Sequence, residues 1–167
     1  MEKDNFKSES IAKLKELAEN IDICMFCTQL DKHPIAARPM SCNEVDDQGN
    51  LWFLSDARSN KNFDIRQDDA VQLLFSKISD SQYLSVYGHA SIYTDKKTVE
   101  EHWTPIAKAW WDNADDPNIT VIKITPTDAY YWDTKDGKAV AFIKWAANAL
   151  GAGLDDGGVQ GNINLNQ

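Results

Sequence analysis

The stretch LWFLSDARSNKNFDI, residues 51–65, combines a strand pattern with the start of a helix and decides how the rest of the chain is interpreted. Leu51, Phe53 and Ser55 point to one face of the predicted strand, and the two residues between them point to the other. A period of two over this length is typical of a strand with one face toward a core. A polar turn is predicted at residues 56–58, where the strand ends.

A short helix is predicted directly after this turn, over about residues 59–67. Ser59 is a natural N-cap, and Lys61 falls in the first helical turn. A strand that ends in the Ser55 hydroxyl, followed by a helix start with a second hydroxyl and a cation, presents donors suited to a phosphate group. The open N–H groups and partial positive charge of the helix start add to this attraction. An ordinary cap beside a solvated lysine is the alternative that so short a pattern leaves open.

Length and charge limit the classes of protein and partner. A chain of 167 residues is long enough for one domain with a sizeable core. Its formal net charge of −9 repels nucleic acids and anionic membranes, so neither is an expected partner. No run of 18 apolar residues and no apolar segment after the initial Met occurs, which favours a cytoplasmic protein. An anionic ligand would need a local group of cations, and the only arginines are Arg38, Arg58 and Arg66.

The cysteines include a C-x-x-C pair, Cys24 and Cys27, with the spacing of redox or metal sites. The pair lies within an apolar, strand-like run, where residues three apart point to opposite faces. Such motifs normally start a helix or are completed by a second cysteine pair. Buried free thiols in a reducing compartment are therefore predicted, and no metal site is expected.

Upstream of residue 51 the pattern predicts a helix, two strands and two turns. An amphipathic helix is expected over about residues 8–20, followed by a strand over 21–30 and, after a turn, a second strand over 34–43. Pro39 cannot donate to a ladder, so the second strand should lie at an edge or be bulged there. The turn cluster at 46–50 is expected to join this strand to residue 51 as a hairpin.

Downstream, four further strands are predicted, over residues 70–76, 83–93, 119–125 and 129–133. Gly88, inside the second of these, indicates a bulge or a close backbone approach. The helical pattern over 95–111 is expected to break at Pro105. From residue 138 the pattern also allows a helix, and the glycine-rich segment from residue 151 is expected to be disordered. About six short strands interrupted by helices predict an antiparallel barrel with helical additions rather than a parallel sheet.

Several motifs together resemble those of the pyridoxamine 5′-phosphate oxidase-like flavoproteins, and among them the general stress protein 26 group. They are AARPM at 36–40, WFLSDARSNK at 52–61, VYGHASI at 86–92, WTPIAKAWW from residue 103 and ITPTDAYYWD from residue 124. The resemblance covers about residues 11–145. It implies a mainly β protein with added helices: an FMN-binding, Greek-key antiparallel split β-barrel domain over residues 1–145, with a flexible C-terminal tail over 146–167.

The same resemblance implies a homodimer with FMN at the subunit interface. Residues carried over from the family to line the cofactor are Arg38, Pro39, Met40 and Phe53. Those carried over for the phosphate are Ser55, Ser59 and Lys61. An aromatic residue of the opposite subunit, Trp132 or Trp110, would close over the flavin. A cation at Arg38 near the pyrimidine side of the ring would stabilise the anionic reduced flavin, whereas an ordinary surface ion pair is the alternative for this residue.

Two departures from the family pattern bear on function. Oxidase members carry an arginine before the phosphate lysine, whereas this chain has Asn60, so one charge-assisted contact is lost unless Arg58 or Arg66 replaces it. The oxidases also bind pyridoxine phosphate with a C-terminal Arg-x-His segment, and no arginine follows Arg66. Oxidation of pyridoxamine 5′-phosphate itself is therefore not expected.

The expected function is that of an FMN-dependent oxidoreductase acting on an unidentified small substrate in a stress response, with NADH or NADPH as the donor to test. A flavin-binding or flavin-storage stress protein without turnover is the alternative, and a deazaflavin or haem could replace FMN. Catalytic residues are not assigned, because no Ser-His-acid or Cys-His pairing is evident for the histidines, His33, His89 and His102.

Overall fold

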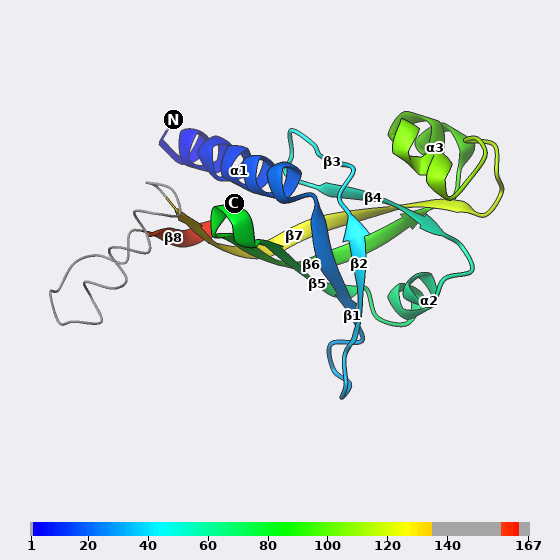
Figure 1. Cartoon of the computed structure of the whole chain (residues 1–167), viewed down its shortest axis with the longest axis horizontal. Coiled ribbons are helices and arrows are strands. Elements are labelled where there is room, and N and C mark those ends of the chain that lie inside the picture. Colours follow the sequence, from blue (N-terminus) through cyan, green and yellow to red (C-terminus); the bar gives the residue numbers. More distant parts are fainter. Residues whose placement is uncertain (1, 135–157, 164–167) are drawn as a thin grey trace, which may run out of the picture.

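The computed structural model describes residues 2–134 and 158–163, and within them the fold is built on one antiparallel sheet. Its strands are β1 (Ile23–Thr28), β2 (Ala36–Ser41), β3 (Glu44–Val45), β4 (Leu51–Asp56), β5 (Ala70–Lys77), β6 (Gln82–Tyr93), β7 (Ile119–Thr134) and β8 (Gly158–Ile163). The helices are α1 (Glu2–Ile21), α2 (Asn60–Gln67) and α3 (Lys96–His102), with 3₁₀ turns η1 (Ile78–Asp80) and η2 (Pro105–Ala109). Figure 1 shows the helices placed around a curled sheet.

The sheet is a split β-barrel, as the sequence predicted. The strands follow the order β2-β1-β5-β6-β7-β4-β3, and β8 pairs with β7. The two ends of this order, β2 and β3, are consecutive in the chain but do not pair with each other. Because residue 41 ends β2 and residue 44 begins β3, the two edges stay close at one end of the barrel. The sheet therefore closes around a core while leaving a split between β2 and β4.

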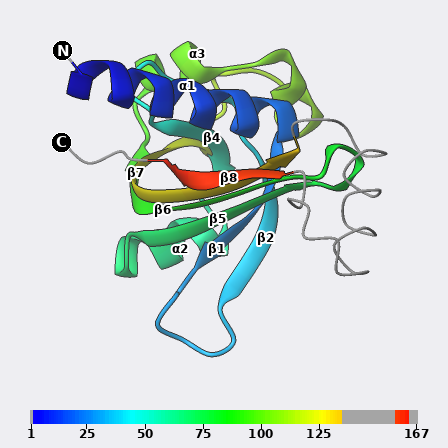
Figure 2. The same cartoon turned by 90° about the vertical axis from the view of Figure 1, so that its left-hand side faces the viewer.

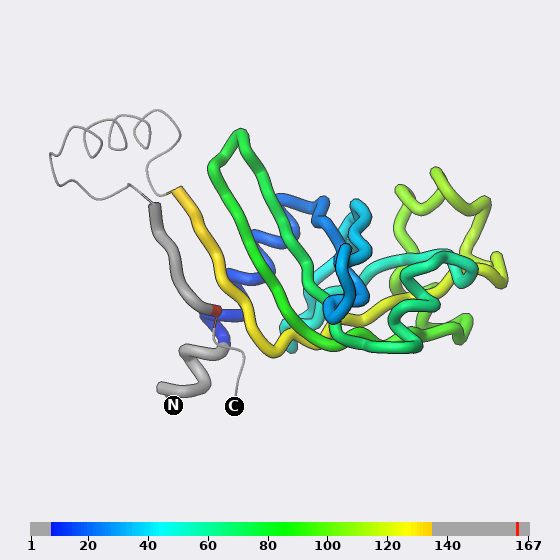
Figure 3. Tube along the Cα trace, turned by 90° about the horizontal axis from the view of Figure 1, so that it is seen from below, coloured from blue at the N-terminus to red at the C-terminus, as the bar shows by residue number. Residues whose placement is uncertain are grey.

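The core lies between α1 and the concave side of the sheet. Leu14, Leu17 and Ala18 of α1 are fully buried against it. Figures 2 and 3 show α1 crossing over the strands, with the β5–β6 hairpin and β7 running side by side beneath it. At the centre, the rings of Phe26 on β1 and Phe53 on β4 meet edge to face with centroids 5.3 Å apart.

Three local predictions are confirmed. Along β4, burial alternates as expected, with Leu51, Phe53 and Ser55 buried. Strand β2, which carries Pro39, is an edge strand paired only with β1. The register between β6 and β7 shifts at Gly88, where a Cβ atom would lie 2.4 Å from the Thr125 carbonyl oxygen. Only glycine permits this close approach of two backbones.

Three other predictions were wrong in part. The turn at 46–50 joins β4 to the two-residue strand β3 instead of the longer β2, which pairs with β1. Residues 119–134 form one strand around a bulge rather than two strands. Residues 158–163, expected in a flexible tail, form the strand β8, which pairs antiparallel with β7 along one edge. The helix allowed after residue 138 and the remainder of the tail lie outside the described residues.

No helix in residues 2–134 has the length and apolar character needed to cross a membrane.

Candidate functional site

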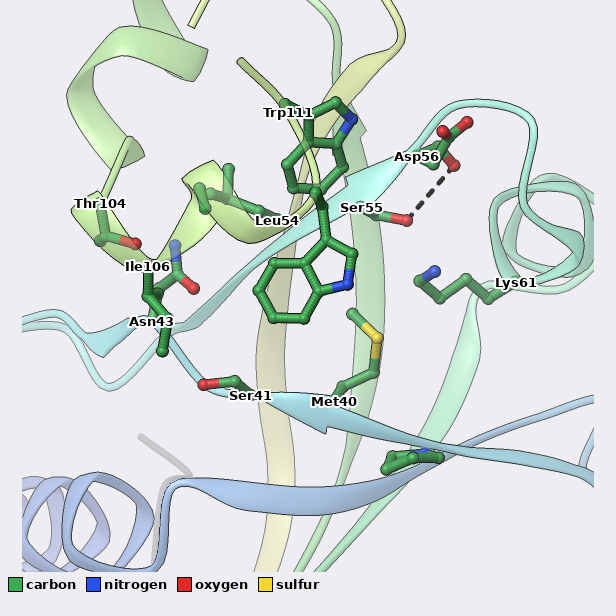
Figure 4. A pocket seen from close by; sticks show the side chains of 13 residues that line it. Met40, Ser41, Asn43, Leu54, Ser55, Asp56, Lys61, Thr104, Ile106 and Trp111 are labelled. Atoms are coloured by element: carbon green, nitrogen blue, oxygen red, sulfur yellow. Dashed lines mark hydrogen bonds between the residues drawn. The ribbon is translucent and has the colours of Figure 1, made fainter. Parts of the chain in front are cut away.

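A pocket of about 230 Å³ lies at the split of the barrel, between β2 and β4, with the start of α2 on one side and η2 on the other. Figure 4 shows side chains from these elements converging on the same space. The lining residues are Pro39, Met40, Ser41, Asn43, Leu54, Ser55, Asp56, Lys61, Thr104, Ile106, Ala107, Trp110 and Trp111. Their chemistry divides the pocket into an apolar wall and a polar end.

The apolar wall is formed by Met40 and Leu54 together with the segment that follows α3. Trp111 packs against a second hydrophobic cluster centred on Val99 and Val121, which fixes its place beside Leu54. Trp110 is 67% exposed, and its ring centroid lies 6.4 Å from that of Trp111. Aromatic faces beside a polarizable methionine form a surface suited to a flat, apolar ring.

The polar end is dominated by Lys61, in the first turn of α2. Within residues 2–134, the Lys61 ammonium has no ion-pair or hydrogen-bond partner, and the N–H groups of Asn60 and Lys61 have no acceptor. Burial lowers the pKa of Lys61, and the charge of Arg38 lowers it further, against the opposing effect of Asp56. A partly buried cation beside open N–H groups is a ready site for an anion.

A buried group of hydroxyls and one amide lies beside Lys61. The Ser55 hydroxyl donates to Asn62 Oδ1 at 2.7 Å, and Asn62 Nδ2 donates to Thr120 Oγ1 at the same distance. Ser59 is the N-cap residue of α2, as predicted, but its side chain makes no capping bond. Its hydroxyl lies 3.3 Å from both Ser55 Oγ and Asn62 Oδ1. These contacts bind the end of β4 to the start of α2.

Arg38, predicted to line a flavin ring, is held inside the barrel edge instead of among the lining residues. Its guanidinium donates to the Phe26 carbonyl, to Thr28 Oγ1 at 2.8 Å and to Asp64 at 3.4 Å. Asp64 is 5% exposed and also accepts from Thr28 and Gln29 at 2.7 and 2.6 Å. Arg38 nevertheless lies close enough to Lys61 to affect its pKa, so its charge adds to the positive potential of the polar end.

Neither arginine suggested as a replacement for the missing second cation is free at the site. Arg58 forms a bidentate pair with Asp56, at 3.0 and 2.7 Å, and these hydrogen bonds lower the pKa of Asp56 to about 2. Arg66 is exposed in the last turn of α2, at the opposite end from Lys61. Asn60 adds no charge, so Lys61 is the principal cation of the pocket.

Phe53 lies away from the pocket, and so does Trp132 of the same chain, which was predicted to close over the flavin from the opposite subunit. Phe53 shares a strand face with Ser55 but sits deeper in the barrel, where it is fully buried against Phe26. Trp132 lies near one end of β7, whereas Ile119, at the other end, pairs with Asp56 beside the pocket. The structure thus brings Pro39, Met40, Ser55 and Lys61 together, with Ser59 and Arg38 behind them.

The histidines and cysteines do not line this pocket. His89 bonds to Asp69 at 2.8 Å on the sheet surface, His102 stacks on Trp52 with centroids 4.0 Å apart, and His33 lies in the exposed β1–β2 turn. The cysteines are buried and free, as predicted, and burial raises the pKa of each thiol, that of Cys42 to about 12. The described ranges contain no cluster of ligands that could hold a metal ion.

Sequence reasoning missed the role of residues 104–111 and of Asn62. The sequence motifs place Trp110 only as an aromatic residue from the opposite subunit and give Trp111 no role at the site. Their position after a helix-breaking Pro105 was the available signal, because a 3₁₀ turn there directs Ile106 and Trp110 into the pocket. Asn62 carried a weaker signal: a short polar residue in a helix interior normally has a specific hydrogen-bond partner.

Comparisons with known proteins agree with this geometry. Residues 9–155 match the family model described as pyridoxamine 5′-phosphate oxidase like. Protein bli-3 of Neurospora crassa is 30% identical over 90 residues, which cover 48% of this chain and 43% of that protein, so the chain spans less than half of that relative's length. The crystal structure of general stress protein 26 from Bacillus anthracis str. Sterne is similar, with a TM-score of 0.62, 27% identity and coverage of 78% of this chain and 95% of that one.

The general stress FMN/FAD binding protein from Xanthomonas citri shares the fold, with a TM-score of 0.64, 22% identity and coverage of 77% of this chain and 91% of that one. Because the family model spans most of the described sheet and the pocket between β2 and β4, the chain belongs to the pyridoxamine 5′-phosphate oxidase-like family.

Proposed function

We propose that the chain binds FMN, with the phosphate at the start of α2 and the isoalloxazine ring against Met40 and the aromatic wall. The observation that carries this proposal is Lys61: a partly buried ammonium without an acid partner in the described residues, facing a pocket. A phosphate monoester supplies the missing negative charge and can accept from the open N–H groups of α2. The apolar wall accounts for the rest of the ligand, because a flat ring needs such a surface.

Flavin is the ligand class that the comparisons support, since the similar protein of Xanthomonas citri is described as FMN/FAD binding. FMN is proposed over FAD because of size. The terminal phosphate of FMN is matched by Lys61 and the start of α2, whereas FAD would also have to place a second phosphate and an adenosine beside a pocket of about 230 Å³. Deazaflavin and haem are alternative ligands, and the mass of the chromophore extracted from the protein distinguishes them from FMN.

The pocket also supports assembly as a homodimer with the cofactor near the interface. Its volume of about 230 Å³ is below the ~300–1,000 Å³ that usually encloses a ligand of this size. A second surface is therefore needed to cover the flavin. The outer face of the sheet offers one, because it exposes large apolar side chains on neighbouring strands: Ile23, Met25, Leu74, Tyr83 and Trp132.

Bound flavin would supply the electron-transfer chemistry of an oxidoreductase. The residues of this chain would hold the phosphate and orient the ring, and Arg38 would add positive potential near it. No histidine lines the described pocket, and its titratable side chains are Asp56 and Lys61. The protein therefore contributes binding and electrostatic effects, and the small substrate that exchanges electrons with the flavin is unidentified. The family expectation of a role in stress response belongs to the same proposal.

The test is to purify the protein, record its visible spectrum and measure the mass of the extracted chromophore. FMN in a ratio near one per chain is expected. Anaerobic addition of NADH or NADPH should then bleach the flavin bands. A chromophore of another mass would refute the FMN assignment, and a flavin that neither donor reduces would refute the simple reductase function. Light scattering should return the mass of two chains.

The absence of a proton-transferring histidine among the lining residues favours one alternative, a protein that binds or stores flavin without turnover. Tight FMN binding without acceleration of any electron transfer would support it. Measurable turnover would exclude it.

A further inference from the structure

In the buried group of Ser55, Ser59, Asn62 and Thr120, the acceptor-only Ser55 carbonyl oxygen determines which atom donates in each hydrogen bond. Thr120 Oγ1 lies 3.1 Å from the Ser55 carbonyl oxygen, which can only accept, so the single hydroxyl hydrogen of Thr120 is used there. Thr120 must then accept from Asn62, which places the amide nitrogen toward Thr120 at 2.7 Å. The amide oxygen consequently faces Ser55 and Ser59.

An amide oxygen only accepts, so both serine hydroxyls donate to Asn62. Ser55 Oγ lies 2.7 Å from Asn62 Oδ1 and 3.4 Å from the Asp56 carbonyl oxygen, the contact drawn in Figure 4. The shorter contact is the stronger hydrogen bond, so the Ser55 hydrogen is assigned to Asn62. Ser55 therefore presents lone pairs to the pocket. A phosphate dianion also presents only lone pairs, so in the observed arrangement the serine hydrogens point to Asn62 and not to a phosphate in the pocket.

We propose that Asn62 is a positioning residue whose side-chain amide turns over when a phosphate group binds and thereby releases the Ser55 and Ser59 hydrogens to that phosphate. In the turned state Asn62 Nδ2 donates to the serine oxygens, and Thr120 donates to Asn62 Oδ1. The one bond given up is that from Thr120 to the Ser55 carbonyl, and two charge-assisted bonds to the ligand replace the serine bonds to Asn62. The amide oxygen and nitrogen are similar in size, so a fully buried Asn62 can turn with little displacement of its neighbours.

This inference rests on the proposed phosphate site, and substitution at Thr120 tests it. Thr120→Val leaves one end of the Asn62 amide without a partner in either orientation, and it already lacks the bond to the Ser55 carbonyl that the wild type gives up when the amide turns, so turning no longer costs that bond. We expect FMN to bind about two- to tenfold more tightly, in line with the worth of one hydrogen bond, while riboflavin, which lacks the phosphate, binds as before. Thr127→Val, a threonine-to-valine change elsewhere on β7, is the matched control and should alter neither ligand.

Asn62→Asp provides the opposite change, because a carboxylate cannot donate to the serines in either orientation. FMN affinity should fall by at least about tenfold relative to riboflavin. The new carboxylate also repels a phosphate by its charge alone, so a purely structural role is tested by Thr120→Val, where it predicts that both ligands weaken together with the melting temperature. Equal or weaker FMN binding in Thr120→Val, or an unchanged FMN-to-riboflavin ratio in Asn62→Asp, would overturn the inference.

Inorganic phosphate separates this inference from the proposed function. If the wild-type protein binds neither flavin, the proposed function fails, and calorimetric titration with inorganic phosphate still tests the amide. Tighter phosphate binding by Thr120→Val than by the wild type supports the inference. Equal or weaker binding, or no phosphate binding by the wild type, overturns it.

Discussion

Replacing Lys61 with alanine should remove most of the specific affinity for a phosphate group. Lys61 is partly buried, lacks an ion-pair partner in the described residues and lies at the helix start, so its charge and the helix dipole act on the same ligand. A charge-assisted contact of this kind is worth roughly 1.5–3 kcal/mol. Because about 1.4 kcal/mol is a factor of ten in affinity, FMN should bind roughly ten- to a hundredfold more weakly.

The assay is a fluorescence titration of wild-type and Lys61→Ala protein with FMN and riboflavin. Riboflavin affinity should hardly change, because it has no phosphate to lose. Arg66→Ala is the matched control: it removes the same charge from the same helix, but at the exposed last turn. It should retain wild-type affinity apart from a small long-range effect, which salt suppresses.

Stability distinguishes loss of the site from loss of the fold. Burial opposes the charge of Lys61, and no acid partner in the described residues compensates it, so Lys61→Ala should leave the melting temperature unchanged or slightly raised. Wild-type FMN affinity in a folded Lys61→Ala protein would refute the phosphate assignment. An equal loss of FMN and riboflavin would also refute it, because that loss would come from the ring and not from the phosphate.

Other predictions concern the surroundings of the site. Lys61 has a pKa lowered from 10.5, and a bound phosphate would raise it. FMN affinity should therefore be complete where Lys61 is charged and should decrease as the pH rises, starting before pH 10.5, because free Lys61 deprotonates there. An FMN affinity that stays constant above pH 10.5 would contradict this. Arg58→Ala leaves the Asp56 carboxylate unpaired near the ligand and should weaken FMN about two- to fivefold in low salt, an effect that adding Asp56→Asn should reverse. The buried cysteines should resist a thiol reagent in the folded protein and yield three reactive thiols after unfolding, whereas rapid native labelling would argue against their burial. Phe53→Ala should cost about 3–5 kcal/mol of unfolding free energy, and a change below 1 kcal/mol would mean that the Phe53 site is not the packed core seen here.

Local physical rules predicted most of the elements. The alternation in residues 51–55, the edge position of Pro39 and the bulge at Gly88 each follow from the geometry of a few bonds, and each is present. The same holds for the helix start at Ser59, whose position depends on residues adjacent in sequence. The family motifs then supplied the barrel, because they fix the order of strands that no short-range pattern determines.

Depth along a strand was not predictable in this way. A period of two places Phe53 and Ser55 on the same face, and both are indeed buried on it. The period does not say where the strand leaves the core, so it cannot separate a core residue from one at the pocket. The Arg38–Asp64 pair joins residues 26 positions apart and depends on the packing of α2 against β1, so no local pattern predicts it. The position of β8 likewise depends on its ladder with β7 and not on its own sequence pattern.

The strongest argument for a ligand at this site comes from comparing Lys61 with the other partly buried cations in the described residues. Each of them has a partner in the chain: an acid for Lys13, Lys15, Arg38 and Lys77, and two aromatic rings for Lys123. Burying a cation without compensation is unfavourable, and the lowered pKa of Lys61 is consistent with that cost. In a chain with a net charge of −9, acids are plentiful, yet the nearby Asp56 and Asp64 are bound to arginines. Committing both acids to other cations keeps Lys61 available, and a phosphate group is the partner that we propose for it.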